Sequence, residues 1–200
     1  MTPTLSLDDI LAQLLPMHRH ICPRQVLGVR IGMCAAELLG LYLPQEDKRL
    51  LAFVETDGCF ADGVAVATGC WMGHRTMRLI DYGKVAATFV DTRTNQAVRI
   101  APSPHARAAA AQALPHAKSR WHAQRDAYQT LPDSVLLCAT PVEVTLPLAQ
   151  IIARPGVRVS CDTCGEEIIN SREVLRGAQT LCQSCAGETY YRDVVREAIA

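Results

Sequence analysis

The sequence predicts an α+β domain over residues 1–155, followed by a small cysteine-rich module over residues 156–200. Three observations support this division. Apolar residues make up 49% of the chain and charged residues 20%, which supplies enough apolar material for a core. Helical and strand-like patterns follow one another in the order helix, strand, helix and three strands. Near residues 154–160, a Pro-Gly turn leads into polar, cysteine-rich sequence.

The N-terminal region predicts two helices joined by a short loop. Ser6 is a suitable N-cap for the first helix, and Pro16 is expected to end it. The second helix is expected over residues 23–41, because proline suits the first position of a helix. Gly28 and Gly32 lie one turn apart on it and leave a smooth strip where another backbone can approach closely.

The following segments predict a sheet. Residues 50–55 have the apolar run of a buried strand, and residues 57–70 resemble a helix with a glycine near its end. Three further strands are expected at residues 76–81, 84–91 and 97–101. The segment DYGK between the first two of these has a glycine where a hairpin turn needs one.

The remaining part of the first domain is expected to be mainly helical. Alanine and charged residues over 105–130 indicate a long exposed helix, bent or broken at Pro115. Residues 132–140 suggest one or two further helical turns, and residues 142–148 suggest another strand.

Charge and hydropathy exclude several classes of protein. The formal net charge is zero, which argues against general attraction to nucleic acid or anionic lipid. The N-terminus has no basic leader before an apolar stretch, and no apolar run reaches the roughly 18 residues that cross a bilayer. We therefore expect a cytoplasmic protein. Nine cysteines in such a chain suggest metal ligands or redox thiols more than disulfides.

The strongest motif is a pair of Cys-x2-Cys sequences, Cys161/Cys164 and Cys182/Cys185. Two such pairs complete a tetrahedral Zn²⁺ shell, and four cysteines leave no open position, so the zinc would be structural. Four buried free cysteines or a redox dithiol pair are the alternatives. Residues 186–199 look helical, as in a treble-clef or zinc-ribbon module. Acidic residues offset the few basic ones in this module, which favours contact with protein over nucleic acid.

A second cluster begins at His18, His20 and Cys22, which face one way if the loop is extended. Cys22 precedes the second helix, where the helix dipole favours a thiolate and lowers the pKa of the thiol. Cys59 and Cys70 are eleven residues apart, or ~16 Å along a helix, so one ion in one protomer would not reach both. A bystander histidine and small apolar cysteines are the alternative interpretation.

Several motifs taken together resemble the FmdE family, named for one of the subunits of formylmethanofuran dehydrogenase. They are HRHICP, the Cys-x-x-Asp of Cys59 and Asp62, the TGC of residues 68–70, and the DYGK of residues 81–84. The resemblance covers about residues 14–92, and many members also carry a C-terminal zinc module. It implies a mixed four-stranded sheet with packed helices, like the second domain of glyceraldehyde-phosphate dehydrogenase, and a homodimer. A dimer would let Cys70 serve the site of a neighbouring protomer.

The resemblance also implies a link to a molybdenum or tungsten enzyme that reduces carbon dioxide onto methanofuran, because the family is named from that gene neighbourhood. The chain has no pterin, iron–sulfur, phosphate-loop or dinucleotide motif. It departs from the family at Arg19 and Arg24, where glycine is usual, at Trp71, where threonine is usual, and at His74, where lysine is usual. These changes bear on the substrate rather than on the metal ligands.

Three functions remain open. The first is an accessory protein that holds a transition metal or a metal-containing ligand for a partner redox enzyme. The second is an enzyme with Cys22 or Cys59 as nucleophile, or the metal as Lewis acid, and with His20 and Asp62 as acid and base. The third is a regulator that docks through the zinc module. Candidate catalytic residues are Cys22, Cys59, Asp62 and Cys70. Candidate metal ligands are Cys161, Cys164, Cys182 and Cys185 for zinc, and His18, His20, Cys22 and Cys59 for a second metal.

Overall fold

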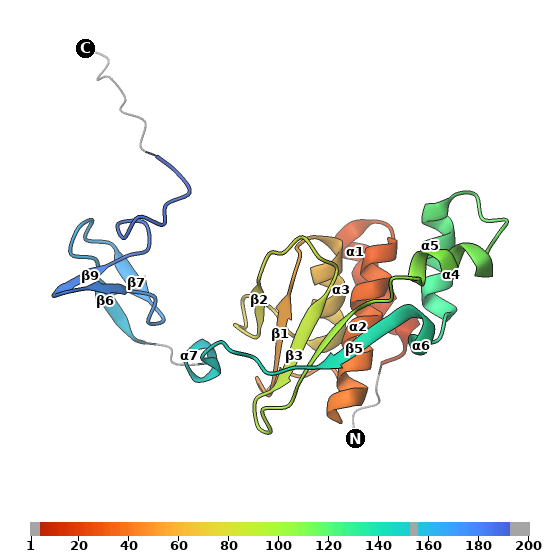
Figure 1. Ribbon diagram of the computed structural model, residues 1–200, viewed down its shortest axis with the longest axis horizontal. Helices are drawn as coiled ribbons and strands as arrows, with labels where there is room; N and C mark the ends of the chain where they lie inside the picture. The colour runs from red at the N-terminus through yellow and green to blue at the C-terminus, as the bar shows by residue number, and fades with distance from the viewer. Residues whose placement is uncertain (1–4, 153–155, 193–200) are drawn as a thin grey trace, which may run out of the picture. The chain divides into compact units, whose positions relative to one another are not determined.

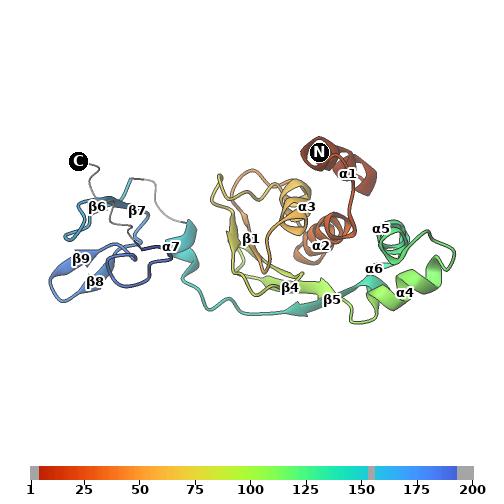
Figure 2. The same cartoon turned by 90° about the horizontal axis from the view of Figure 1, so that it is seen from above.

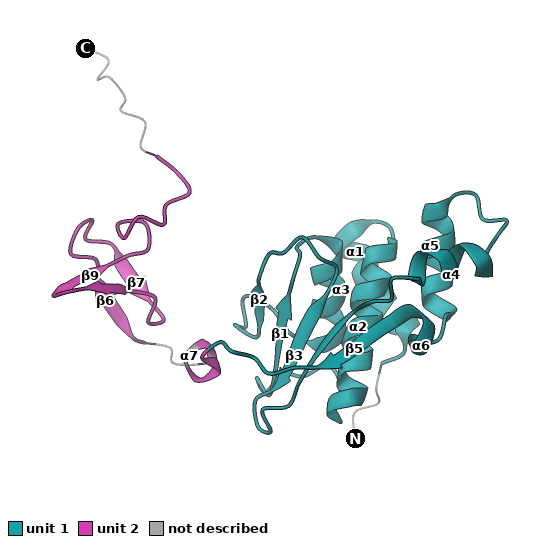
Figure 3. Cartoon of the chain, in the orientation of Figure 1, with its two compact units in different colours: residues 1–146 teal, residues 147–200 magenta. Residues whose placement is uncertain are grey.

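The structure is a computed structural model that describes residues 5–152 and 156–192. It divides into two compact units, residues 1–146 and 147–200 (Figure 3). The division falls before a short helix, α7 (Leu148–Ile152), and so earlier than the Pro-Gly turn where we expected it. Within the described ranges no helix is long and apolar enough to span a membrane.

The first unit is a five-stranded mixed sheet with helices packed against it (Figures 1 and 2). Its helices are α1 (Leu7–His18), α2 (Pro23–Leu39), α3 (Cys59–Thr68), α4 (Ala106–Ala113), α5 (Arg120–Thr130) and α6 (Asp133–Leu136). Its strands are β1 (Leu50–Val54), β2 (Met77–Leu79), β3 (Ala87–Asp91), β4 (Ala97–Pro102) and β5 (Leu137–Pro141). The strand order is β2-β1-β3-β4-β5, and only β1 and β2 pair in parallel. The α+β class is confirmed, with five strands in place of four.

The expected hairpin at DYGK is wrong, because β1 lies between β2 and β3. Every residue of β1 is buried, which suits a central strand, whereas Leu79 of β2 is exposed at the sheet edge. The chain therefore passes from β1 through α3 to the parallel strand β2, and DYGK then leads back across β1 to β3. The hairpin joins β3 to β4 instead, through residues 92–96.

The strand expected at residues 142–148 is also wrong. The fifth strand precedes it, because β5 pairs with β4 from Leu137 to Pro141. The N–H of Val142 donates the last bond to the sheet, at the carbonyl of Ala97, which is the first residue of β4. Beyond that point β4 offers no further backbone partner, so residues 143–147 leave the sheet without forming a strand.

The first helix runs past Pro16 and ends at His18, so the expectation that Pro16 stops it is wrong. Arg19 then takes a left-handed conformation with φ of 60°, and its N–H donates to the carbonyl of Leu15. Ser6 is the N-cap, as expected. The long helix expected over residues 105–130 is broken into α4 and α5 around Pro115, also as expected.

Helices α2 and α3 meet backbone to backbone. A Cβ atom added at Gly28 would lie 2.3 Å from the carbonyl oxygen of Phe60, and one at Gly63 would lie 2.5 Å from the carbonyl oxygen of Gln25. Gly32 lies farther along α2 and faces Thr68, farther along α3. The two helices therefore run in the same direction, and their N-termini lie at the same end. The smooth strip on α2 is thus buried within the chain.

The ends of β3 and β4 are held by a buried ion pair. Asp91 is 1% exposed, and its carboxylate accepts two hydrogen bonds from Arg49, at 3.0 and 2.7 Å, and one from the backbone N–H of Arg93. The Arg49 guanidinium is the main reason why the pKa of Asp91 is lowered to about 2.

We expect the substitution Gly28→Ala to destabilise the first unit by about 3 kcal/mol, because the new methyl group would force the two helix backbones apart. Gly73→Ala is the matched control, since its Cβ would meet nothing within 4 Å and the position has no positive φ. Chemical denaturation followed by circular dichroism measures both. Equal stability of the two variants would contradict the backbone contact.

We also expect acid to weaken the first unit through Asp91. Its pKa in the folded chain lies below the unfolded value of 3.8, so the stabilisation is present above pH 4 and is lost as the pH falls toward 2. The loss is about 2 kcal/mol. Denaturation of the wild type and of Asp91→Asn at pH 5, 4, 3 and 2 measures it, and the variant should lack this part of the pH dependence.

Candidate metal centre and small-molecule pocket

The second unit is built around the four cysteines of the paired motif. Their four sulfur atoms all lie within 4.8 Å of one another, and the Cys164 and Cys182 sulfurs are 3.9 Å apart. Four sulfurs bound tetrahedrally to zinc at about 2.3 Å lie about 3.8 Å apart, so the cluster fits such an ion. The four-cysteine cluster could therefore bind a metal such as zinc.

Tight turns hold these sulfurs in place. Gly165, with φ of 76°, closes the first turn by donating its N–H to the carbonyl of Cys161. The sulfur of Cys161 accepts the N–H of Cys182, and the sulfur of Cys182 accepts the N–H of Cys185. Backbone N–H groups lower the pKa of Cys161 to about 6, whereas the adjacent Cys182 thiol raises the pKa of Cys185 to about 12. A cation among them would favour all four thiolates.

The rest of this unit consists of two short hairpins. Strand β6 (Arg158–Ser160) pairs with β7 (Glu167–Ile169), and β8 (Val174–Arg176) pairs with β9 (Gln179–Leu181). Residues 186–192 form turns and no helix, so this part of the expected C-terminal helix is wrong. The expected residues 193–199 lie outside the described residues.

In the first unit, His18 connects Cys59 with Asp62. Its Nε2 lies 2.7 Å from a carboxylate oxygen of Asp62, and its Nδ1 lies 3.9 Å from the sulfur of Cys59. Cys59 and Asp62 share the first turn of α3, while His18 is the last residue of α1. His18 reaches this position because α1 continues past Pro16, and so its partner is not the one that an extended loop predicts.

Cys22 completes this group at the N-cap of α2. The side-chain oxygen of Gln25 accepts the N–H of Cys22 at 2.7 Å, and the side-chain nitrogen of the same amide is buried without a partner in the described structure. The Cys22 and Cys59 thiols are in hydrogen-bonding contact. Burial, followed by this contact, raises the pKa of Cys59, and the charge of Arg24 opposes that rise. The lowering of thiol pKa values expected at a helix start is therefore not seen at Cys59.

The other two candidates lie apart from this group. His20 is exposed, and its ring faces Trp121 at a centroid distance of 6.4 Å. Cys70 is fully buried beyond the other end of α3, and its thiol donates to the carbonyl of Leu50. Burial raises the pKa of Cys70 to about 11. Cys70 thus contributes to the core of its own protomer, and the predicted homodimer stays a prediction.

Across the described residues, only the four-cysteine cluster brings three or more ligand atoms together as a ready metal site. The group of His18, Cys22 and Cys59 is looser. For tetrahedral zinc, a sulfur and a nitrogen ligand lie about 3.6 Å apart, close to the 3.9 Å between Cys59 and His18. A small closure would therefore suit an ion, and the second metal stays a prediction.

A pocket of about 720 Å³ opens over these thiols. Cys22 and Cys59 line it together with Arg24, Arg107, Trp121 and Tyr128. The last three residues come from α4 and α5, far along the chain, and sequence reasoning missed them. In the sequence, Arg24 stands out only as a departure from the family. An isolated arginine or tryptophan on an exposed helix carries no signal of its own in a single sequence.

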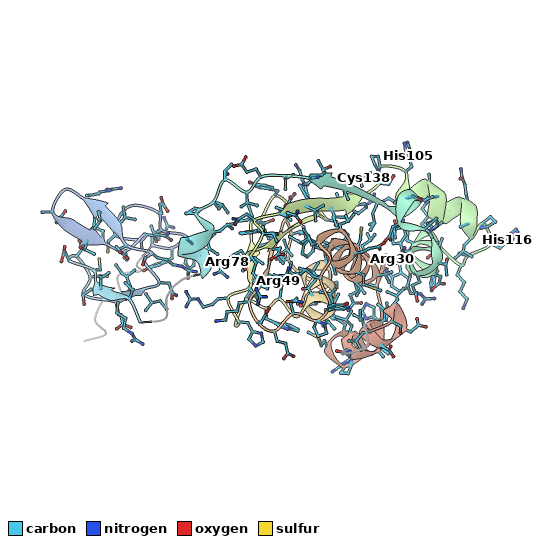
Figure 4. All side chains as sticks on the ribbon, turned by 90° about the horizontal axis from the view of Figure 1, so that it is seen from below. Arg30, Arg49, Arg78, His105, His116 and Cys138 are labelled. Atoms are coloured by element: carbon cyan, nitrogen blue, oxygen red, sulfur yellow. The ribbon has the colours of Figure 1, made fainter. Side chains whose placement is uncertain are left out.

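One arginine holds the wall of this pocket. Arg30 of α2 donates hydrogen bonds of 2.6–2.7 Å to the carbonyls of Tyr128 and Leu131 and to the carboxylate of Asp133. It lies between α2 and the chain that joins α5 to α6 (Figure 4). These bonds fix α5, and with it Trp121, relative to the N-terminus of α2.

Comparisons with known proteins place the first unit. A family model described as "FmdE, Molybdenum formylmethanofuran dehydrogenase operon" matches residues 17–137. A probable S-adenosyl-L-methionine-binding protein of Archaeoglobus fulgidus is 38% identical over 104 residues, which are 49% of this chain and 28% of that protein. The chain therefore spans less than a third of the length of this curated relative.

The fold also has a solved counterpart. The crystal structure of an FmdE-like protein of the tungsten formylmethanofuran dehydrogenase type, from Syntrophus aciditrophicus, matches with a TM-score of 0.60 and 20% identity. The match covers 96% of this chain and 100% of that chain, so both proteins share the fold. Because the family model covers more than half of the sequence, this chain belongs to the FmdE family.

Proposed function

We propose that the first unit holds a transition metal ion through Cys22, Cys59 and the Nδ1 of His18, and presents it to a small molecule in the pocket above. The placement of the His18 ring between a thiol and a carboxylate carries this proposal. Histidines that bind metal through one ring nitrogen commonly donate the other N–H to a carboxylate, which orients the ring and makes it a better ligand. Asp62 is in that position.

Two further features support the assignment. Three protein ligands leave one coordination position open, as in catalytic rather than structural sites, and both thiols line the pocket. The unpartnered side-chain nitrogen of Gln25 belongs to the amide that caps Cys22. A buried donor there would be satisfied by a thiolate sulfur or by a bound ligand. Imidazole with thiolates suits Zn²⁺, Ni²⁺, copper or iron.

In this proposal the protein is an accessory to a redox enzyme, in keeping with the operon named in the family description. The second unit would carry a structural zinc ion at Cys161, Cys164, Cys182 and Cys185. Its buried core is small, centred on Ile168 and Leu181 with Cys161 and Ala186, so metal binding would supply much of its folding free energy.

A second candidate is thiol-dependent catalysis. Cys59, His18 and Asp62 are in the order that a nucleophile, a base and an orienting carboxylate require. His18 therefore replaces His20 as the candidate base. Here Cys59 alone would react and Cys22 would be dispensable, whereas the metal site needs both thiols. Activity that survives chelation would favour catalysis by the thiol.

The relative from Archaeoglobus raises S-adenosyl-L-methionine as a ligand to test. The pocket volume of about 720 Å³ is within the range of ~300–1,000 Å³ that is usual for sites of small ligands. The shared 104 residues are a small part of that relative, so its ligand site can lie in the remainder. A thermal shift of the first unit with this ligand, abolished by Trp121→Ala, would place it in the pocket.

For the second unit we expect Cys182→Ser to lose one equivalent of bound zinc and to lose protection from proteolysis over residues 156–192, because the tetrahedral shell is then incomplete. Cys138→Ser is the matched control, since Cys138 is an exposed, isolated thiol (Figure 4). Elemental analysis and limited proteolysis of the full chain measure both effects. Equal zinc content in the two variants would contradict the assignment.

For the first unit we expect two metal equivalents in the wild type and one in His18→Ala, Cys59→Ser and Cys22→Ser. Asp62→Asn should keep the metal but bind it about 10- to 100-fold more weakly. His116→Ala, which removes an exposed histidine outside the pocket, should keep both ions. Competition with a chelator and the thiolate charge-transfer absorption of bound cobalt measure these values. One equivalent in the wild type at saturating metal would exclude the second site.

A further inference from the structure

We propose that the pocket over Cys22 and Cys59 binds a small organic oxyanion, whose carboxylate or phosphate is held by Arg24 and Arg107 and whose flat or apolar body rests against Trp121. This inference deepens the proposed function by naming the class of molecule that meets the metal, and it rests on the same pocket.

The charge of the lining is one-sided. Arg24 and Arg107 both line the pocket, while no aspartate or glutamate does. No hydrogen bond or ion pair among the described residues engages either guanidinium, in contrast to Arg30, Arg49 and Arg99. The nearby carboxylate of Asp62 is already engaged by His18. Two cations without carboxylate partners, on the wall of one cavity, favour an anionic ligand.

The fold adds positive potential at the same place. Helices α2 and α3 run in the same direction, and Cys22 and Cys59 mark their starts at the pocket. The N-terminus of a helix carries partial positive charge and free N–H groups, and both favour anions. Arg24 is close enough to Cys59 for its charge to act on that thiol, which places one cation beside the thiols.

The other wall is apolar and rigid. Trp121 is 40% exposed, although its indole would gain from a partner that excludes water. Arg125 lies over the indole ring, 5.4 Å from its centroid, and is itself paired with Asp126. Trp121 also lines the pocket, beside Tyr128. The Arg30 bonds hold this helix in place, so the wall is formed before a ligand arrives.

The test uses the full chain in a Trp71→Phe background, which leaves Trp121 as the one remaining tryptophan. Its fluorescence is titrated with phenyl phosphate, benzoate and benzyl alcohol at constant ionic strength. We expect at least one of the two anions to change the signal saturably and to bind at least tenfold more tightly than the neutral alcohol. Preference between the anions identifies a phosphate ester or a carboxylate as the native group.

Arg24→Gln and Arg107→Gln should each weaken binding of the anion about tenfold, because a hydrogen-bonded charge is lost. Arg93→Gln, an exposed arginine paired with Asp47, is the control and should leave binding unchanged. Failure of both anions to bind, equal binding of benzyl alcohol, or no effect of the two pocket substitutions would overturn the inference. Cys59→Ser separates it from the proposed metal site, since that variant should lose the metal and retain anion binding.

Discussion

The contact of the α2 and α3 backbones at Gly28 and Gly63 is the constraint on which the functional end of the molecule depends. Side chains at these positions would separate the helices, since even a methyl group at Gly28 would lie 2.3 Å from a carbonyl oxygen. Because the helices are close and run in the same direction, their first residues, Cys22 and Cys59, lie side by side. Two thiols that are distant in sequence thereby become a pair.

Around this pair, each element contributes one group whose position is set by packing elsewhere. The sheet fixes α3, because α3 connects the parallel strands β1 and β2. The extra turn of α1 carries His18 to Asp62. Arg30 ties α5 to α2 and so carries Trp121 to the pocket. The site therefore consists of residues that support one another only when the whole first unit is folded.

The two cysteine groups differ in what positions their ligands. The four cysteines of the second unit are held by local turns and by N–H···S bonds between near neighbours, so their geometry is nearly independent of the rest of the chain. The thiols of the first unit have no such local frame and depend on the approach of two helices. A closed shell suits a structural ion, and a loose group beside a cavity suits one that meets a ligand.

The sequence alone determined the features that rest on local spacing. Cys-x2-Cys pairs, the Ser6 cap, the break at Pro115 and the family motifs predicted the four-cysteine cluster, the first helix, two later helices and the α+β class. Only the tertiary structure decided which strands pair and which side chains meet. DYGK is compatible with a hairpin, yet the fully buried β1 takes the central place between β2 and β3. Likewise Arg24 and Trp121 carry no signal until packing brings them to one cavity, because contacts between distant segments are set by burial and backbone approach rather than by spacing along the chain.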